Sequence, residues 1–166
     1  TPLLVQLSII YFGLFTAISI PRITILGFVD LSRFIPGVVA LALNSSAYVA
    51  EIFRAGILAV DKGQTEAARS LGLSSWQSMR LVVLPQAIKN VLPALANEVV
   101  TMVKESSICS MLGMAELMFV SKTVATGTYI TLAPYTIAAL IYFCINYPAS
   151  KAIEAIERRM RRGDKQ

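Results

Sequence analysis

Long runs without a charged residue constrain this chain more than any other feature. Residues 2–20, 34–50 and 123–150 contain no Asp, Glu, Lys or Arg. A helix needs about 20 predominantly apolar residues to cross the hydrocarbon core of a bilayer. Charged residues make up 15% of the chain, whereas soluble domains contain about 25%. The runs therefore favour an integral membrane protein.

A third candidate span, residues 81–103, is less apolar because it contains Lys89, Asn97 and Glu98. The last run exceeds the length of one span, and Pro134 marks the expected start of its membrane portion. We therefore predict an all-α fold, a polytopic membrane helical bundle of about four spans in a single transmembrane domain. The predicted spans cover about residues 2–20, 34–55, 81–103 and 132–152.

The distribution of cations predicts the orientation of these spans. Residues 51–80 and 151–166 carry ten Lys and Arg residues, whereas residues 21–33 and 104–122 carry four. Lys and Arg accumulate in cytoplasmic loops of membrane proteins. We therefore expect the loop between the second and third spans to be cytoplasmic, together with the tail 153–166. Thr1 is then expected near the same face.

The C-terminal tail is predicted to continue as a helix beyond the membrane. Glu154 precedes Arg158 by four residues, and Glu157 precedes Arg161 by four, which is the favourable order for helical ion pairs. The net charge of +5 occurs in an apolar chain. It therefore favours contact with the anionic lipid of a bilayer over contact with nucleic acid.

The sequence argues against an enzyme. There is no histidine, no GxxxxGK[ST] phosphate-binding loop and no GxSxG nucleophile motif. We expect no catalytic residue, no metal site and no cofactor, with any ATP bound by a partner subunit. Cys109 and Cys144 lie in apolar surroundings without CxxC spacing, so we expect two buried thiols rather than a disulfide.

The loop at residues 61–80 contains the signals of two short helices. Asp61 or Thr65 can cap the first helix, whose first turn is expected to contain Glu66. Gly72 is placed to end it in the left-handed conformation. Ser74 or Ser75 can then cap a second helix that continues towards Pro85. A helix this short is not stable alone, so it needs a neighbouring surface.

The first of these helices carries small apolar side chains flanked by charges. Ala67, Ala68 and Leu71 form the expected apolar patch, and Glu66 and Arg69 lie at its edge. A partner protein or the lipid headgroups can supply the surface that holds it. The residues alone leave both alternatives open.

The loop resembles a known motif. Its pattern is Glu66-Ala67-Ala68-x-x-x-Gly72, nine residues, and then Val82-x-Leu84-Pro85. This resembles the EAA loop of permease subunits in bacterial ABC importers, although the family often has Ile at the position of Val82. The resemblance implies a cytoplasmic coupling helix that fits a groove on the ATP-binding subunit. The docking residues that it implies are Glu66, Ala67, Ala68, Arg69, Leu71 and Gly72.

Further segments resemble the polar amino acid uptake branch of this family, which carries histidine, arginine, glutamine or glutamate. They are residues 44–56, 103–108 and the opening residues 1–6. Members usually have five spans, so the resemblance implies that this chain lacks the N-terminal span. It also implies a multi-pass protein of the bacterial cytoplasmic (inner) membrane. The implied partners are an ATP-binding subunit dimer, a second permease subunit, identical or homologous, and an extracytoplasmic substrate-binding protein.

Polar residues inside the predicted spans are candidates for the substrate pathway. Glu98 is costly in a bilayer unless it faces a cavity or has a partner. It can line a polar pathway or form an interhelical ion pair, and Asn44 can line the pathway or mediate helix packing. The pathway candidates are Asn44, Tyr48, Asn97 and Glu98. The alternative function is an ion-gradient-driven secondary amino acid transporter that uses Lys89 and Glu98 as a relay.

Overall fold

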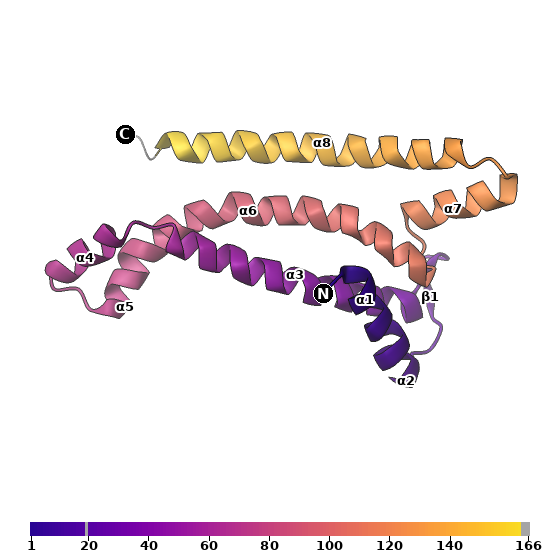
Figure 1. The fold of residues 1–166 in the computed structure, drawn as a ribbon, viewed down its shortest axis with the longest axis horizontal. Helices are drawn as coiled ribbons and strands as arrows, with labels where there is room; N and C mark the ends of the chain where they lie inside the picture. Colours follow the sequence, from indigo (N-terminus) through magenta and orange to yellow (C-terminus); the bar gives the residue numbers. More distant parts are fainter. Residues whose placement is uncertain (19, 164–166) are drawn as a thin grey trace. The chain divides into compact units, whose positions relative to one another are not determined.

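The computed structural model describes residues 1–18 and 20–163, and the side chains of these as far as residue 160. Helices dominate this part of the chain, as predicted (Figure 1). The one exception among the described residues is a pair of two-residue strands that the sequence analysis did not predict.

The N-terminal apolar run forms a helix of three parts. These are α1 (Leu3–Ser8), the π-helical η1 (Ile9–Phe15) and α2 (Thr16–Ile18). The strands β1 (Thr24–Ile25) and β2 (Val29–Asp30) then form an antiparallel hairpin in which Ile25 pairs with Val29.

The hairpin leads directly into α3 (Leu31–Leu58). The Asp30 carboxylate accepts hydrogen bonds from the backbone N–H of Ser32 at 3.0 Å and from its hydroxyl at 2.7 Å. The hydrogen bond from the Ser32 hydroxyl is the main reason why the pKa of the Asp30 carboxyl is lowered from its ordinary value. Asp30 thus caps a helix that begins three residues before the predicted span 34–55.

Two short helices follow α3. They are α4 (Lys62–Ser70) and α5 (Ser75–Ser78). A π-helical turn, η2 (Met79–Val83), joins α5 to α6 (Leu84–Glu105), and the 3₁₀ helix η3 (Ser106–Leu112) ends it. Together these elements form one continuous helix from Ser75 to Leu112. It is longer at both ends than the predicted span 81–103.

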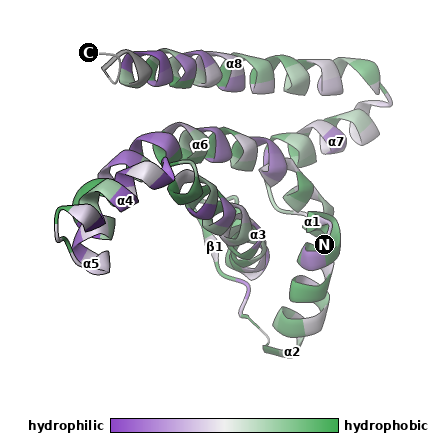
Figure 2. Cartoon of the chain, turned by 60° about the vertical axis from the view of Figure 1, so that its left-hand side comes forward, coloured by the Kyte–Doolittle hydropathy of each residue, from purple (hydrophilic) through white to green (hydrophobic). Residues whose placement is uncertain are grey.

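Two further helices complete the chain. α7 (Leu117–Thr128) is bent by 47° from the helix Ser75–Leu112, and α8 runs from Leu132 to Gly163. α8 begins two residues before Pro134 and continues as a helix through the predicted tail as far as Gly163, while the start of its membrane portion stays a prediction. Figure 2 shows hydrophobic residues along its first half and more hydrophilic residues towards its end.

One of the two predicted ion pairs of the tail is observed. Arg158 lies 3.6 Å from the Glu154 carboxylate. Lys151, for which no ion pair was predicted, lies closer to the same carboxylate, at 2.9 Å. The predicted pair between Glu157 and Arg161 falls outside the described side chains.

Two helices of the described chain are long and apolar enough to cross a membrane. They are α3 and the stretch Leu132–Met160 of α8. A third is present if the bent pair of Ser75–Leu112 and Leu117–Thr128 counts as one span. The apolar helix Leu3–Ile18 is shorter than a full span. The structure thus has two to three candidate spans, and the count of four stays a prediction.

The chain divides into two compact units. The first comprises residues 1–46 and 100–148, and the second comprises residues 47–99 and 149–166. The first unit has a core of Leu7, Ala40, Cys109 and Leu112. Cys109 is buried there as predicted, but Cys144 is exposed, so the expectation of two buried thiols is wrong for Cys144. α8 turns this side chain outward, where apolar surroundings must come from lipid or another chain.

The first unit is also tied together by polar contacts at its turns. Arg33 donates a hydrogen bond from Nη1 to the carbonyl oxygen of Gly113 at 2.7 Å. The Glu116 carboxylate caps α7 by accepting from the backbone N–H groups of Met118 and Phe119, and it also accepts from the hydroxyl of Tyr142 at 3.2 Å. These contacts fix the turn between η3 and α7.

Candidate functional site

The N-terminus of α4 is closed by Asp61. Its Oδ1 accepts a hydrogen bond from the backbone N–H of Gly63 at 2.6 Å, so Asp61, and not Thr65, is the cap. Lys62 is therefore the first residue of the helix. Glu66 then lies in the second turn, which corrects the expectation that it lies in the first.

The C-terminus of α4 is closed around Gly72, as predicted. Gly72 has a φ of +85°, in the left-handed region that residues with a Cβ rarely adopt. The N–H of Leu73 donates to the carbonyl of Ala68 at 3.2 Å, and the N–H of Gly72 donates to that of Arg69 at 3.0 Å. This pair of bonds is the Schellman motif, which satisfies the last carbonyl groups of a helix.

A capping box starts the second short helix. The Ser74 hydroxyl accepts from the N–H of Gln77 at 3.2 Å, and the Gln77 side chain accepts from the N–H of Ser74 at 2.8 Å. Ser74, rather than Ser75, is therefore the cap. Leu73, the last residue of the Schellman motif, directly precedes Ser74, so α4 and α5 are joined by a turn of defined geometry.

Most of the side chains predicted to dock are exposed. Glu66, Ala67 and Arg69 are exposed, and Leu71 is 84% exposed. Ala68 differs, because it is 4% exposed and faces the chain itself. The predicted apolar patch of Ala67, Ala68 and Leu71 is therefore wrong for Ala68, which is buried within the chain. Ala67 and Ala68 are successive residues about 100° apart around the helix, so one is exposed while the other is buried.

One exposed residue beside this surface was missed. Trp76 in α5 is 71% exposed and lies within the capping box, between Ser74 and Gln77. The signal in the sequence was a large aromatic side chain within a polar loop, because aromatic residues are enriched at protein interfaces.

Asn44 has a polar partner inside the first unit. It is 6% exposed, and its Nδ2 donates to Oε2 of the half-buried Glu105 at 3.4 Å. Its neighbour Ser45 is also buried. Glu105 was not among the predicted pathway residues. The available signal was its place in the segment 103–108, the second segment that carried the resemblance.

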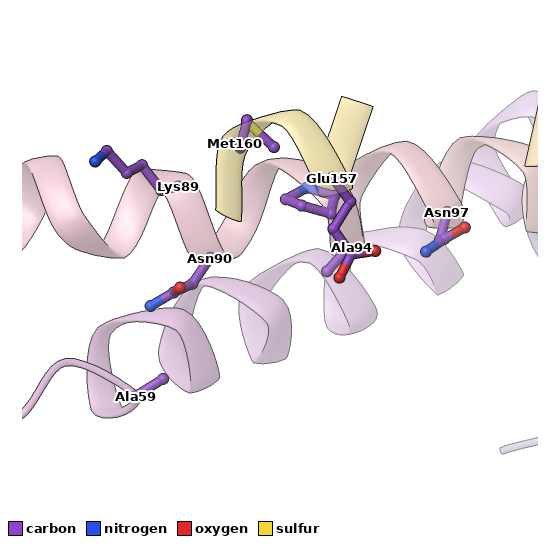
Figure 3. A pocket seen from close by; sticks show the side chains of 8 residues that line it. Ala59, Lys89, Asn90, Ala94, Asn97, Glu157 and Met160 are labelled. Carbon is purple, nitrogen blue, oxygen red and sulfur yellow. The ribbon is translucent and has the colours of Figure 1, made fainter. Parts of the chain in front are cut away.

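The other predicted pathway residues belong to the second unit, so the structure does not bring the four together in one unit. Tyr48 is 54% exposed, Asn97 is exposed and Glu98 is half-buried. Asn97 lines a cavity of about 380 Å³ in this unit. Figure 3 shows the side chains that line it: Ala59, Lys89, Asn90, Pro93, Ala94, Asn97, Glu157 and Met160.

The chain matches one protein family over almost its whole length. Residues 1–162 match the family described as the binding-protein-dependent transport system inner membrane component. The chain belongs to this family. It is therefore a multi-pass inner membrane permease, a membrane component without catalytic activity of its own, and a separate subunit handles ATP. The family description also implies an ATPase and a binding protein as partners.

Individual relatives agree with this permease assignment. The arginine transport system permease protein ArtQ of Bacillus subtilis is 44% identical over 99% of this chain and 71% of its own length. The glutamine transport system permease protein GlnP of Escherichia coli is 35% identical over 97% of this chain and 70% of its own. The permease thus spans about 70% of the length of these relatives.

A solved structure shows the same fold. The crystal structure of an amino acid ABC transporter with histidines matches with a TM-score of 0.85 and 51% identity, over 96% of this chain and 70% of the other. The permease fold expected from the resemblance is therefore confirmed at the level of an ABC amino acid transporter permease. The family membership also favours ATP-driven import over the ion-gradient alternative.

Proposed function

We propose that this permease moves a polar amino acid across the cytoplasmic membrane into the cell, driven by an ATPase dimer that docks on α4. Relatives named for arginine and glutamine, and a related transporter solved with histidines, support this substrate class. An extracytoplasmic binding protein delivers the amino acid. A second permease subunit, identical or homologous, encloses the pathway, because two or three spans are few for a complete one.

The exposed face of α4 carries this proposal. Caps at both ends hold nine residues in a helix on which Glu66, Ala67 and Arg69 are exposed, and Leu71, the C-cap residue, is exposed directly after it. Burying a side chain such as leucine contributes roughly 1.5–3 kcal/mol, so leaving Leu71 84% exposed forgoes most of that free energy. A groove on the ATPase subunit recovers it. The flanking carboxylate and guanidinium groups then orient the helix in the groove.

The cation distribution supports a cytoplasmic position for α4, on the side of the membrane where ATP is available. Residues 51–80 and the tail belong to the cation-rich side, which is cytoplasmic by the positive-inside rule. Movement of the docked ATPase subunits is therefore transmitted to the permease through α4. The turn at Gly72 and the capping box at Ser74 pass it to the helix that begins at Ser75.

Asn44 and Glu105 are the pathway residues that the structure supports best. They are a polar pair within an apolar unit, held 3.4 Å apart on two different helices. The carboxylate of Glu105 suits the ammonium group that every amino acid carries. The Asn44 carboxamide positions that carboxylate by donating to it. Tyr48, Asn97 and Glu98 remain proposed pathway residues of the second unit.

Glu66→Lys tests the docking proposal. We expect uptake and binding-protein-stimulated ATP hydrolysis by the reconstituted complex to fall at least tenfold, because the charge at the edge of the interface is reversed. Glu66→Gln keeps the side-chain length without a charge reversal, and we expect it to retain most of both activities. Membrane insertion should be unchanged for both. Normal coupled ATP hydrolysis by Glu66→Lys would contradict docking through α4.

Substitution of Glu105 tests the pathway proposal. We expect Glu105→Leu to reduce uptake at least tenfold while the complex still assembles and hydrolyses ATP at its basal rate. Asn44→Ala leaves the carboxylate in place but less well oriented, so it should raise the KM for uptake more than it lowers the maximal rate. Equal loss of assembly in both variants would instead assign the pair to structure alone.

A further inference from the structure

The hairpin before α3 presents an apolar cluster that the transport mechanism does not use. Its large apolar side chains are exposed: Leu26 is 79% exposed, Phe28 is 61%, Ile23 is 51% and Ile25 is 46%. Four such residues within six positions are unusual for a water-facing turn, where polar residues and glycine dominate. We define these four residues as the hairpin cluster.

The backbone at the tip adds a second unfavourable feature. Leu26 has a φ of +57° and Gly27 a φ of +78°, the signs of a type I′ turn, and the N–H of Phe28 donates to the carbonyl of Ile25 across it. Asn, Asp and Gly are the usual residues of such turns. A leucine is strained there, and in water its exposed side chain gains nothing in return.

The hairpin is held close to the start of a membrane-crossing helix. The N–H of Leu31, the first residue of α3, donates to the carbonyl of Ile23 at 3.0 Å, and Asp30 caps the helix. α3 is long and apolar enough to span a bilayer. Each strand has two residues, and a strand rises about 3.3 Å per residue. The tip therefore reaches no farther than roughly 10 Å from this helix, a distance comparable to the depth of the interfacial region of a bilayer.

Charges beside the hairpin suit a lipid surface. Arg22 precedes it and is exposed, and Arg33 follows it with its side chain tied to Asp30 and Gly113. Arg22 is thus placed to contact lipid phosphates while the cluster enters the region below them. Basic residues flanking an apolar segment are the pattern of segments that lie in the membrane interface.

We propose that the hairpin cluster inserts into the outer leaflet at the headgroup–acyl boundary and anchors the N-terminal end of α3 there. The occupant of this apolar surface is lipid, because the hairpin is continuous with a membrane span and too short to leave its boundary. Burial of Leu26 in the acyl region then offsets the strained turn. The anchor sets the depth and tilt of α3 in the bilayer.

A spin label measures this depth directly. A nitroxide is attached at Leu26→Cys in a permease lacking Cys109 and Cys144, assembled with a cysteine-free ATPase subunit in vesicles that contain anionic phospholipid. We expect collisions with oxygen, which concentrates in acyl chains, to exceed those with a water-soluble nickel complex. At Arg22→Cys, the matched headgroup-level site, we expect the reverse ratio. Phe28→Cys provides a second label position without a positive φ in the described backbone.

Two results would overturn this proposal. Labels at both 26 and 28 with the accessibility of a water-exposed site would show that the hairpin stands clear of the bilayer. Labels shielded from both reagents would show that protein covers the cluster. If that shielding appears only when the substrate-binding protein is added, the hairpin is a docking site for that protein and not a lipid anchor.

Discussion

Replacing Gly56 with leucine is expected to prevent the permease from assembling. α3 and α6 lie in close contact at this glycine, because a Cβ built on it would overlap Cγ2 of Val91 and lie 3.4 Å from the carbonyl oxygen of Ala87. The β-branched Val91 cannot rotate away freely. Overpacking typically costs 1–3 kcal/mol, and close helix contacts in membranes depend on small residues. We expect the yield of assembled transporter, measured by size-exclusion chromatography in detergent, to fall at least tenfold.

A paired substitution distinguishes this steric cause from a general intolerance of the site. Gly56→Ala should reduce the yield and thermal stability of the complex, and the double variant Gly56→Ala with Val91→Ala should recover most of both. Gly37→Ala is the matched control. The atom that its Cβ would overlap is the flexible end of Met114, which can move aside. Failure of Val91→Ala to rescue, with Gly37→Ala equally harmful, would contradict the packing explanation.

Three substitutions of Gly72 are expected to separate backbone strain from charge at the proposed docking loop. Apart from its two chain neighbours, no atom of the described residues lies within 4 Å of a Cβ built on Gly72, so its φ of +85° is what opposes a side chain there. Asparagine tolerates this conformation, and aspartate has nearly the same shape. Valine does not tolerate it, and the left-handed conformation costs an ordinary residue about 1–2 kcal/mol.

We expect Gly72→Asn to keep at least half of the uptake, and Gly72→Val to lose about tenfold because strain of about 1.4 kcal/mol opens the Schellman turn. Gly72→Asp should lose more than Gly72→Asn, since the two differ only in a charge placed at the edge of the ATPase groove. Uptake and copurification of the ATPase subunit provide the measurements. Equal activity of the Asn and Asp variants would remove Gly72 from the contact surface and leave it a purely local role.

The loop at residues 61–80 was predictable because its signals are local. Capping by Asp61 and Ser74 and the left-handed Gly72 depend on side chains within three or four residues of the backbone groups that they satisfy. The burial of Ala68 was harder to predict from the sequence. It depends on how α4 packs against the following helical turn, and alanine gives no signal of its own because it suits either face.

The pairing of Asn44 with Glu105 was beyond sequence reasoning because 61 residues separate them. Their contact depends on the register of α3 against α6, which the apolar pattern does not define when helices are apolar on several sides. The hairpin was missed for a different reason. Only the second central residue of its turn is a glycine, Gly27, and the first is Leu26, which is not a usual turn residue. The segment therefore resembles the end of an apolar run.

The unbroken helix from Ser75 to Leu112 has a mechanical consequence. Ser75 is the first residue of α5, directly after its cap, and Glu105 lies 30 residues later on the same helical run. Under the docking proposed for α4, a displacement of the loop therefore reaches the proposed pathway residue through continuous helical backbone rather than through a connecting loop.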